Sequence, residues 1–317
     1  MTTVREMAPG RALRGRAAAE EASAAQRLRT ELGPMVDVRE SKEAEEPILG
    51  PRVRAAILGW LAEIHAAADL AAVGVKPRST ALLYGPPGCG KTTLAHHLAA
   101  RLGVPLVIVQ AEQLVEAKLG GTGRAIADLF DGLAKVGAPC VVLMDEIDAI
   151  GSERSNDDQA CSREMNAALT TLLQKIEAFG GRLIAATNRH DKLDKALWRR
   201  FGLQIDVALP GDEERWSILK RYGLPFDFDD DTIDALAEIT RGAAPSLLRQ
   251  TMEGIKRTLV LGERLRLPVN DPGAVLRIVI EHARPHPDYE PPPLWADPSL
   301  ARMFAPEAWP PTRGTTP

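Results

Sequence analysis

The chain has 317 residues, of which 45% are hydrophobic, 26% charged and 4% aromatic, and its formal net charge is -4. This composition is typical of a globular protein with enough apolar residues for a packed core. The slight acidity gives no global basic field, which argues against nucleic acid as a partner. Three scattered cysteines, Cys89, Cys140 and Cys161, form neither a disulfide framework nor a zinc motif. Because the N-terminus has no apolar signal segment and no uncharged apolar run approaches about 18 residues, we expect a cytoplasmic protein without a membrane span.

Residues 1–45 are rich in Ala, Arg and Glu and contain few large apolar side chains. A helix over 11–32 would have only Leu13, Leu28 and Leu32 as apolar anchors, so it would bury little surface. We therefore interpret 1–45 as an N-terminal helical or flexible arm. This arm is either solvated or a helix that docks a partner or a neighbouring subunit.

Short apolar segments that alternate with helices follow from residue 46. An amphipathic helix begins after Pro51, and further helices are predicted over 91–102 and 126–135. Apolar strands between such helices indicate a parallel sheet that is covered on both faces. We therefore expect an α/β fold over 46–209, an αβα sandwich with a parallel five-stranded sheet. The predicted strands are 81–84, 106–110, 140–144, 182–186 and 203–208.

The chain changes character after Pro210, where no further strand is predicted. A small all-α lid domain is expected at 210–285, because four segments in this region have helical apolar spacing. The last segment, 286–317, is crowded with proline. We expect an extended or disordered Pro-rich tail there.

A glycine-rich motif connects the strand at 81–84 to the helix that follows it. Residues 85–92 read Gly-Pro-Pro-Gly-Cys-Gly-Lys-Thr and match the pattern GxxxxGK[ST]. The glycines let the backbone approach phosphates, so that the N–H groups of the loop and of the helix N-terminus meet the negative charge. Lys91 is expected to reach the β- and γ-phosphates, and the Thr92 hydroxyl to ligate Mg²⁺. The expected nucleotide-binding residues here are Pro87, Gly88, Cys89, Gly90, Lys91, Thr92 and Thr93.

Two acids, Asp145 and Glu146, end the apolar strand that begins at residue 140. Carboxylates at the carboxyl end of a parallel strand lie beside the crevice where phosphates bind. Asp145 is therefore expected to hold Mg²⁺ through its water shell, and Glu146 to polarise the attacking water as a general base. Asp148 caps the next segment in our interpretation, and we assign it no chemistry.

Five motifs resemble those of the AAA+ ATPases, and of the AAA subfamily in particular, and they follow one another in the order that is usual in the family. The likeness covers about residues 46–265, and it implies a P-loop NTPase fold and a Mg²⁺-dependent ATPase that uses ATP. The second region of homology has the shorter form of bacterial members. The motifs are Walker A at 85–92, the pore-loop segment at 118–130, Walker B at 143–148, sensor 1 at 183–188 and the second region of homology at 193–201.

The resemblance gives roles to three further catalytic residues. It implies that Asn188 hydrogen-bonds the γ-phosphate or the attacking water, and that Arg199 or Arg200 is an arginine finger. A finger reaches into the site of the neighbouring subunit and offsets charge on the transferred phosphoryl group. The two arginines are adjacent here, so the sequence leaves open which one is the finger. The family is typically hexameric, and we expect a homo-oligomeric ring.

Two regions depart from the family pattern. In the pore loop, Lys118 occupies the aromatic position and is followed by Leu119 and Gly120, so the grip on a threaded polypeptide differs or is absent. In the lid, Arg249 is either a sensor 2 arginine or a helix-surface residue. Ile48, Leu49 and Gly50 occupy the segment where the family packs adenine, although they could equally anchor the core.

The resemblance implies an ATP-driven ring that remodels, unfolds or disassembles a protein substrate, with a protease among the candidate partners. The alternative is a nucleotide-dependent regulatory switch or assembly factor that controls a partner without threading it. A nucleic-acid-directed machine is disfavoured by the acidity and by the lack of a DNA-binding module. The residues do not identify the substrate.

Overall fold

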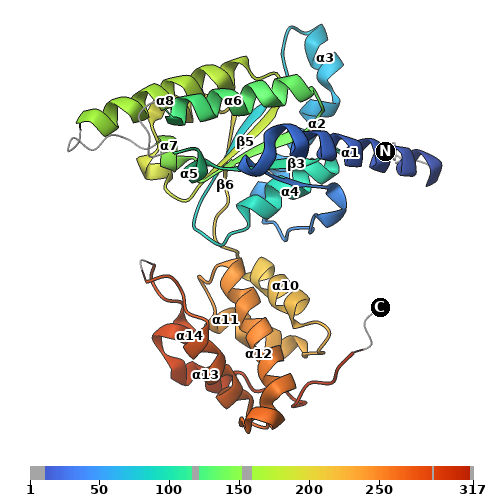
Figure 1. Cartoon of the computed structure of the whole chain (residues 1–317). Helices are drawn as coiled ribbons and strands as arrows, with labels where there is room; N and C mark the ends of the chain where they lie inside the picture. Colours follow the sequence, from blue (N-terminus) through green and yellow to red (C-terminus); the bar gives the residue numbers. More distant parts are fainter. Residues whose placement is uncertain (1–10, 116–120, 152–158, 288, 315–317) are drawn as a thin grey trace. The chain divides into compact units, whose positions relative to one another are not determined.

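The computed structural model describes residues 11–115, 121–151, 159–287 and 289–314. The chain forms two compact units, and Figure 1 shows their elements in colours that follow the sequence. The first, which we call the α/β unit, extends to Pro47 and adds Ala55–Tyr84 and Lys91–Asp206. The second, which we call the helical unit, comprises Ile48–Arg54, Gly85–Gly90 and the chain from Val207 onward.

The α/β unit is built on a sheet whose strand order is β1-β3-β4-β5-β2-β6. All neighbouring strands are parallel except β1 and β3, which are antiparallel. The expected parallel strands are therefore present, but the sheet has six strands and the sequence analysis missed β1. The strands are β1 (Asp37–Arg39), β2 (Thr80–Tyr84), β3 (Leu106–Gln110), β4 (Val141–Asp145), β5 (Arg182–Thr187) and β6 (Leu203–Asp206).

Helices cover both faces of this sheet. Alternate strand residues such as Val107, Val142 and Leu183 join one core with α6 and α8, which pack against each other. Their neighbours in sequence are equally buried, and α4 contacts β3, β4 and β5. This burial on both faces confirms the αβα sandwich. The helices are α1 (Arg11–Leu32), α2 (Pro51–His65), α3 (Ala67–Ala72), α4 (Lys91–Arg101), α5 (Ala111–Leu114), α6 (Gly121–Val136), α7 (Asp148–Gly151), α8 (Gln159–Ala178) and α9 (Lys195–Trp198).

The N-terminal segment is part of this fold and not only an arm. The last two turns of α1 bury Ala25, Leu28 and Leu32 in the same core as α6. Gly132 of α6 allows this contact, because a Cβ there would lie 2.8 Å from Cδ2 of Leu32. The packing of α1 was underestimated from the sequence because Leu32 approaches α6 at a position where that helix has a glycine.

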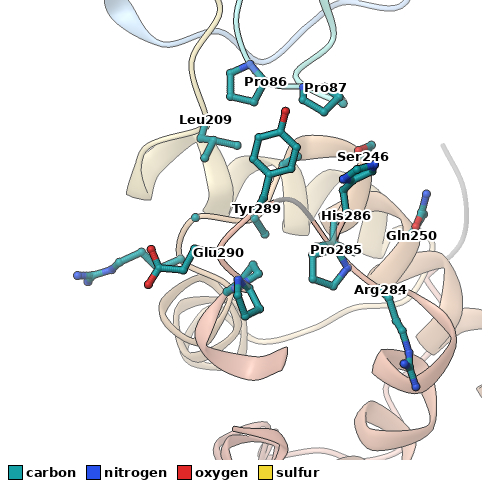
Figure 2. A pocket seen from close by; sticks show the side chains of 18 of the residues that line it. Pro86, Pro87, Leu209, Ser246, Gln250, Arg284, Pro285, His286, Tyr289 and Glu290 are labelled. Atoms are coloured by element: carbon teal, nitrogen blue, oxygen red, sulfur yellow. The ribbon is translucent and has the colours of Figure 1, made fainter. Parts of the chain in front are cut away.

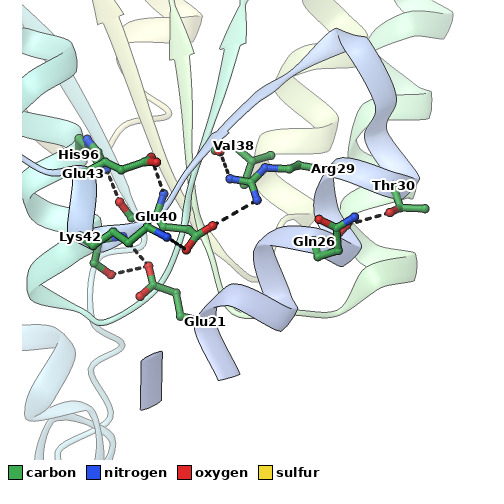
Figure 3. Close-up of polar contacts among 10 residues, drawn as sticks. Glu21, Gln26, Arg29, Thr30, Val38, Glu40, Lys42, Glu43 and His96 are labelled. Carbon is green, nitrogen blue, oxygen red and sulfur yellow. Dashed lines mark hydrogen bonds and ion pairs between the residues drawn. The ribbon is translucent and has the colours of Figure 1, made fainter. Parts of the chain in front are cut away.

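Polar contacts attach the segment after α1 to the rest of the unit (Figure 3). The guanidinium of Arg29 donates to the carbonyl of Val38 at 2.7 Å and to Glu40 at 3.3 Å. Hydrogen bonds from Lys42 and then from Arg29 hold the pKa of Glu40 below its usual value. The carbonyl of Glu40 also lies 3.0 Å from Nε2 of His96, a buried residue of α4. Residues 37–43 therefore pack against the helix that follows the glycine-rich loop.

The helical unit has its own apolar core, to which the C-terminal segment contributes. Leu294, Ala301 and Phe304 are fully buried in it, and the indole N–H of Trp309 donates to the carbonyl of Val269 at 2.6 Å. The expected extended or disordered tail at 286–317 is therefore wrong for 293–296 and 298–303, because prolines also start helices. The elements are α10 (Asp212–Gly223), α11 (Asp230–Ile239), α12 (Pro245–Leu265), α13 (Pro272–His282), α14 (Pro293–Ala296) and η4 (Pro298–Met303).

No helix in the described part of the chain combines the length and the apolar character that crossing a bilayer would need.

Candidate functional site

The glycine-rich loop between β2 and α4 has a backbone that only glycine adopts easily. Gly85, Gly88 and Gly90 have φ values of 141°, 75° and 84°. A Cβ on Gly85 would lie 2.3 Å from the carbonyl oxygen of Val207, so this position cannot hold a larger residue without a backbone shift. The loop thus forms the open backbone curve that the sequence pattern predicts for a phosphate-binding loop.

Two side chains at the start of α4 follow this loop. Lys91 is only 7% exposed. The hydroxyl of Thr92 donates to Oδ2 of Asp145 at 2.7 Å, which joins the start of α4 to the end of β4. A hydroxyl and a carboxylate at this separation are the oxygen donors that Mg²⁺ prefers.

Glu146 follows directly and has an unusual backbone. Its φ is 54°, a left-handed conformation that costs a non-glycine residue about 1–3 kcal/mol. Its N–H donates to Oδ1 of Asp145 at 3.1 Å. Burial, followed by the negative charges of Glu112, Asp145 and Asp148, raises the pKa of the Glu146 carboxyl. A strained, partly desolvated carboxylate next to a metal-type ligand is a strong candidate for a general base.

Asp148 makes a hydrogen bond that the sequence did not predict. Its Oδ1 accepts a 2.7 Å hydrogen bond from the hydroxyl of Thr187, at the end of β5. The same hydroxyl oxygen accepts the N–H of Arg189 at 2.9 Å. These bonds fix both sides of Asn188, which is half-buried at the carboxyl end of β5. The only signal in the sequence was the position of Asp148 two residues after a proposed general base.

The order β4-β5-β2 explains why these residues come together. β5 pairs in parallel with both β4 and β2, so the carboxyl ends of the three strands lie at one edge of the sheet. That edge presents Asp145, Glu146 and Asn188 beside the strand that leads into the glycine-rich loop. Ligands of open α/β sheets bind at this edge.

The two candidate finger residues differ in their surroundings. Asp194 caps α9 by accepting the N–H of Ala196 at 2.7 Å, and both arginines follow that short helix. Arg199 and Arg200 are both exposed. Arg200 forms an ion pair with Glu177, whereas Arg199 has no side-chain hydrogen bond or ion pair within the described residues. Within those residues, neither arginine side chain bonds to a residue of the loop 85–92 of its own chain.

The expected adenine segment and sensor 2 residue belong to the helical unit. Ile48 packs against the core of that unit, and a Cβ on Gly50 would lie 3.2 Å from a carboxylate oxygen of Glu214. Arg249 bonds to Glu253 at 2.8 Å, and its guanidinium lies 5.2 Å from the Tyr222 ring centroid. Arg249 thus has partners on its own helix and beside it. Roles for these residues, and for Leu49, in nucleotide binding stay predictions.

The remaining expected site residues are placed as follows. Cys89 is 9% exposed within the loop, and Thr93 is half-buried in the first turn of α4. The pore-loop residues Lys118, Leu119 and Gly120 lie outside the described residues.

A pocket of about 680 Å³ lies in the helical unit (Figure 2). The loop residues Pro86, Pro87 and Gly88 line part of it. The N–H of Ser246, in the first turn of α12, donates to the carbonyl of Gly88 at 3.2 Å. Further lining residues come from Arg241 to Gln250 and from the segment after α13.

The fold and this edge of the sheet define a P-loop nucleotide-binding domain. Residues 81–209 match the family described as "ATPase family associated with various cellular activities (AAA)". This part of the chain is therefore similar to the AAA family, which agrees with the resemblance that the motifs indicate.

Curated relatives extend the same comparison. The chain is 41% identical over 183 residues to the proteasome-activating nucleotidase of Pyrococcus abyssi, covering 56% of this chain and 46% of that protein. It is 40% identical over 188 residues to the Thermococcus onnurineus protein of the same name, covering 57% and 47%. The chain is 40% identical over 179 residues to the Methanopyrus kandleri protein of the same name, covering 54% of this chain and 41% of that protein. The chain spans less than half the length of these relatives.

Proposed function

We propose that this protein binds ATP at the loop 85–92 and hydrolyses it to ADP and phosphate. The observation that supports this proposal best is the hydrogen bond between Thr92 and Asp145, with Glu146 adjacent to it. These residues join a phosphate-binding loop, a metal-type ligand pair and a candidate base at one edge of the sheet. Glu146 would take the proton of the attacking water while Lys91 holds the phosphates.

Mg²⁺ is the proposed cofactor. Thr92 and Asp145 would hold it, directly or through water, and the ion would neutralise charge on the β- and γ-phosphates. The donor set fits, because both groups are hard oxygen ligands that already lie within 2.7 Å of each other. The role of the protein is then to position the phosphates, the attacking water and the general base.

Phosphate release by the purified chain with ATP and Mg²⁺ tests this function. We expect turnover in the wild-type chain and its loss in Lys91→Ala. Lys135→Ala is the matched control, because Lys135 is an exposed lysine of α6 that pairs with Glu31. No release by the wild-type chain at any protein concentration would refute the proposal.

We also propose that the protein acts as a homo-oligomeric ring, with six subunits as in the typical family member. The exposed position of Arg199 supports a role across a subunit boundary. Light scattering of Glu146→Gln with ATP tests the assembly, because this variant would hold ATP without turnover. A monomer at all concentrations would contradict the ring.

Protein remodelling is the proposed use of this hydrolysis. The relatives are named proteasome-activating nucleotidases, which supports a protease as the partner. An unfolding role in the cytoplasm is part of the same proposal. The alternative is a switch that controls a partner without threading it. The double variant Lys118→Ala with Leu119→Ala separates the two. If the protein threads its substrate, this variant should lose substrate unfolding while ATP hydrolysis continues, whereas unchanged remodelling would favour the switch. We propose that the substrate is a protein, and that its capture by Glu146→Gln would identify it.

A further inference from the structure

The segment 198–202, which we call the finger segment, contains the arginine pair and contacts the start of strand β2. The hydroxyl of Thr80, the first residue of β2, donates to the carbonyl of Arg200 at 3.0 Å. The same oxygen accepts the N–H of Gly202 at 3.0 Å. Thr80 is buried, so water competes little for these bonds. They fix the backbone of the finger segment on its C-terminal side.

A ring contact joins the same strand to the other side of the finger segment. Tyr84 is the last residue of β2, and its ring centroid lies 5.3 Å from that of Trp198, with the planes at 55°. Trp198 is the last residue of α9, packs against the core of the α/β unit and directly precedes Arg199. Tilted rings at this separation attract each other beyond the effect of burial. β2 therefore holds the finger segment both before and after Arg199.

The position of Tyr84 in the chain connects this contact with the nucleotide site. Tyr84 directly precedes Gly85, the first residue of the phosphate loop. Its ring also lies 5.0 Å from the ring of His190, with the planes at 47°, and His190 comes two residues after Asn188. Both ring contacts of Tyr84 lie within the α/β unit. One aromatic side chain thus adjoins the segment of Asn188 and the finger segment.

The ring of Tyr84, and not its hydroxyl, makes these contacts. Within the described part of the chain, the hydroxyl has no hydrogen-bond partner. Burial, followed by the negative charge of Asp206, raises the pKa of the phenol, so the side chain is neutral near pH 7. A phenylalanine at this position would therefore keep the contact, whereas a leucine would remove it.

The finger segment depends on such contacts because the helix before it is short. α9 has four residues, and a helix of this length is not stable without tertiary packing. Arg199 and Arg200 are both exposed, so the backbone sets the direction in which their side chains project. A displacement of about 1 Å in a group that acts on the reacting atoms can cost about 100-fold in rate.

We propose that Tyr84 and Trp198 are positioning residues for the arginine pair. Through Trp198, the ring of Tyr84 holds the backbone of Arg199 in the orientation that the site of a neighbouring subunit requires. The inference rests on the proposed function, because it takes an arginine of this pair as the group that completes that site. It goes further in stating that Tyr84 serves the neighbour's site, although the phosphate loop of its own chain is next to it in sequence.

Substitutions on both sides of the ring contact test the proposal. Tyr84→Leu and Trp198→Leu are each expected to lower turnover at saturating ATP about 10- to 100-fold. Both should leave the affinity for ADP, measured by calorimetry, unchanged, and Tyr84→Phe should keep wild-type turnover. The double variant Tyr84→Leu with Trp198→Leu should lose no more than the more damaged single variant, because both changes remove the same contact. Losses that multiply in the double variant would overturn the inference.

Phe179→Leu is the matched control. Phe179 is half-buried in the same unit, and its ring meets that of Phe130 edge to face, with centroids 5.4 Å apart. This variant removes a comparable aromatic pair and is expected to keep wild-type turnover. A loss as large as that of Tyr84→Leu would overturn the inference, because the loss of any aromatic pair would then have the same effect.

A mixture of subunits separates an effect on the neighbour from an effect on the subunit's own site. Tyr84→Leu subunits retain Glu146, and Glu146→Gln subunits retain an intact finger segment. We expect the mixture to hydrolyse ATP faster than the sum of the two variants measured separately. The absence of this gain, or weaker ADP binding by Tyr84→Leu, would overturn the inference, since Tyr84 would then act on its own phosphate loop.

Two further outcomes distinguish this inference from the proposed function. Unchanged turnover in either leucine variant would overturn the role of the Tyr84–Trp198 contact and leave the proposed ATPase activity standing. The absence of ATP hydrolysis by the wild-type chain would refute the proposed function itself.

Discussion

The hydroxyl of Thr92 donates a 2.7 Å hydrogen bond to Oδ2 of Asp145, which lies 53 positions later in the chain. This bond joins the helix after the glycine-rich loop to the end of a central strand. The other carboxylate oxygen of Asp145 accepts the N–H of Glu146 at 3.1 Å. One aspartate therefore fixes both the proposed metal-ligand hydroxyl and the backbone of the proposed base.

Thr92→Val tests the hydroxyl without removing the β-branched shape of the side chain. The variant keeps the packing of α4 but removes one oxygen ligand and the bond to Asp145. We expect ATP turnover to fall about 100-fold, because ligation of a metal ion contributes several kcal/mol of charge stabilisation. Thr92→Ser retains the hydroxyl and is expected to keep most of the activity. Mg²⁺ titrations of the phosphate-release rate provide the measurement, and equal rates in the valine variant would contradict the assignment.

Glu146→Gln separates binding from chemistry. The amide has nearly the same shape as the carboxylate but cannot accept the proton of the attacking water. We expect ATP affinity to stay within a few-fold and turnover to fall by about 100- to 10,000-fold, the usual contribution of a general base. Glu213→Gln makes the same change at an exposed carboxylate of α10 and serves as the control. Single-turnover measurement of ADP formation checks the result, and normal hydrolysis would assign the base elsewhere.

The arginine pair gives a prediction that the sequence alone left open. Since Arg200 already pairs with Glu177 and Arg199 has no such partner within the described residues, we expect Arg199 to be the finger. Arg199→Ala should bind ATP normally and lose about 1,000-fold or more in turnover. Arg200→Ala should lose less, and Glu177→Gln should retain activity. Replacing both arginines should keep nucleotide binding and remove most turnover, so normal turnover in the double variant would refute both.

A mixture of variants tests whether the finger acts between subunits. Arg199→Ala subunits keep Glu146, and Glu146→Gln subunits keep the arginine. In a mixed ring, an Arg199→Ala site beside a Glu146→Gln neighbour has both groups. We therefore expect the mixture to hydrolyse ATP faster than either variant alone. Turnover no faster than the sum of the two separate variants would place the arginine in its own site or outside it.

The phosphate loop and the acids after β4 could be predicted because their chemistry depends on local sequence. Glycines that need positive φ, a lysine at a helix start and acids at a strand end are visible as short patterns. The order of the parallel strands then brings Asp145 and Asn188 to one edge. Alternation of strands and helices was enough to predict this layout.

The rest depends on contacts between segments that are distant in sequence. β1 has a single buried residue, Val38, between two charged ones, so no apolar pattern marks it. Asp148 and Thr187 lie on different elements, and only the pairing of β4 with β5 makes their bond possible. The packing of the segment after α13 was missed because proline was taken as a sign of disorder, although Trp295 bonds to the carbonyl of Ala283 and Leu294 is buried.

The N-terminal helix provides a test of stability. Leu28 of α1 is fully buried against α6, whereas Arg16 on the same helix is exposed and, among the described residues, pairs with Glu20 alone. Leu28→Ala should lower the free energy of unfolding by about 2–5 kcal/mol, from lost burial and the cavity that remains. Arg16→Ala should change it by less than about 1 kcal/mol, because exposed ion pairs contribute little. Urea unfolding followed by circular dichroism gives both values. If α1 were only a solvated arm, both substitutions would leave the unfolding midpoint unchanged, and a difference between them therefore shows that α1 is a structural part of the α/β unit.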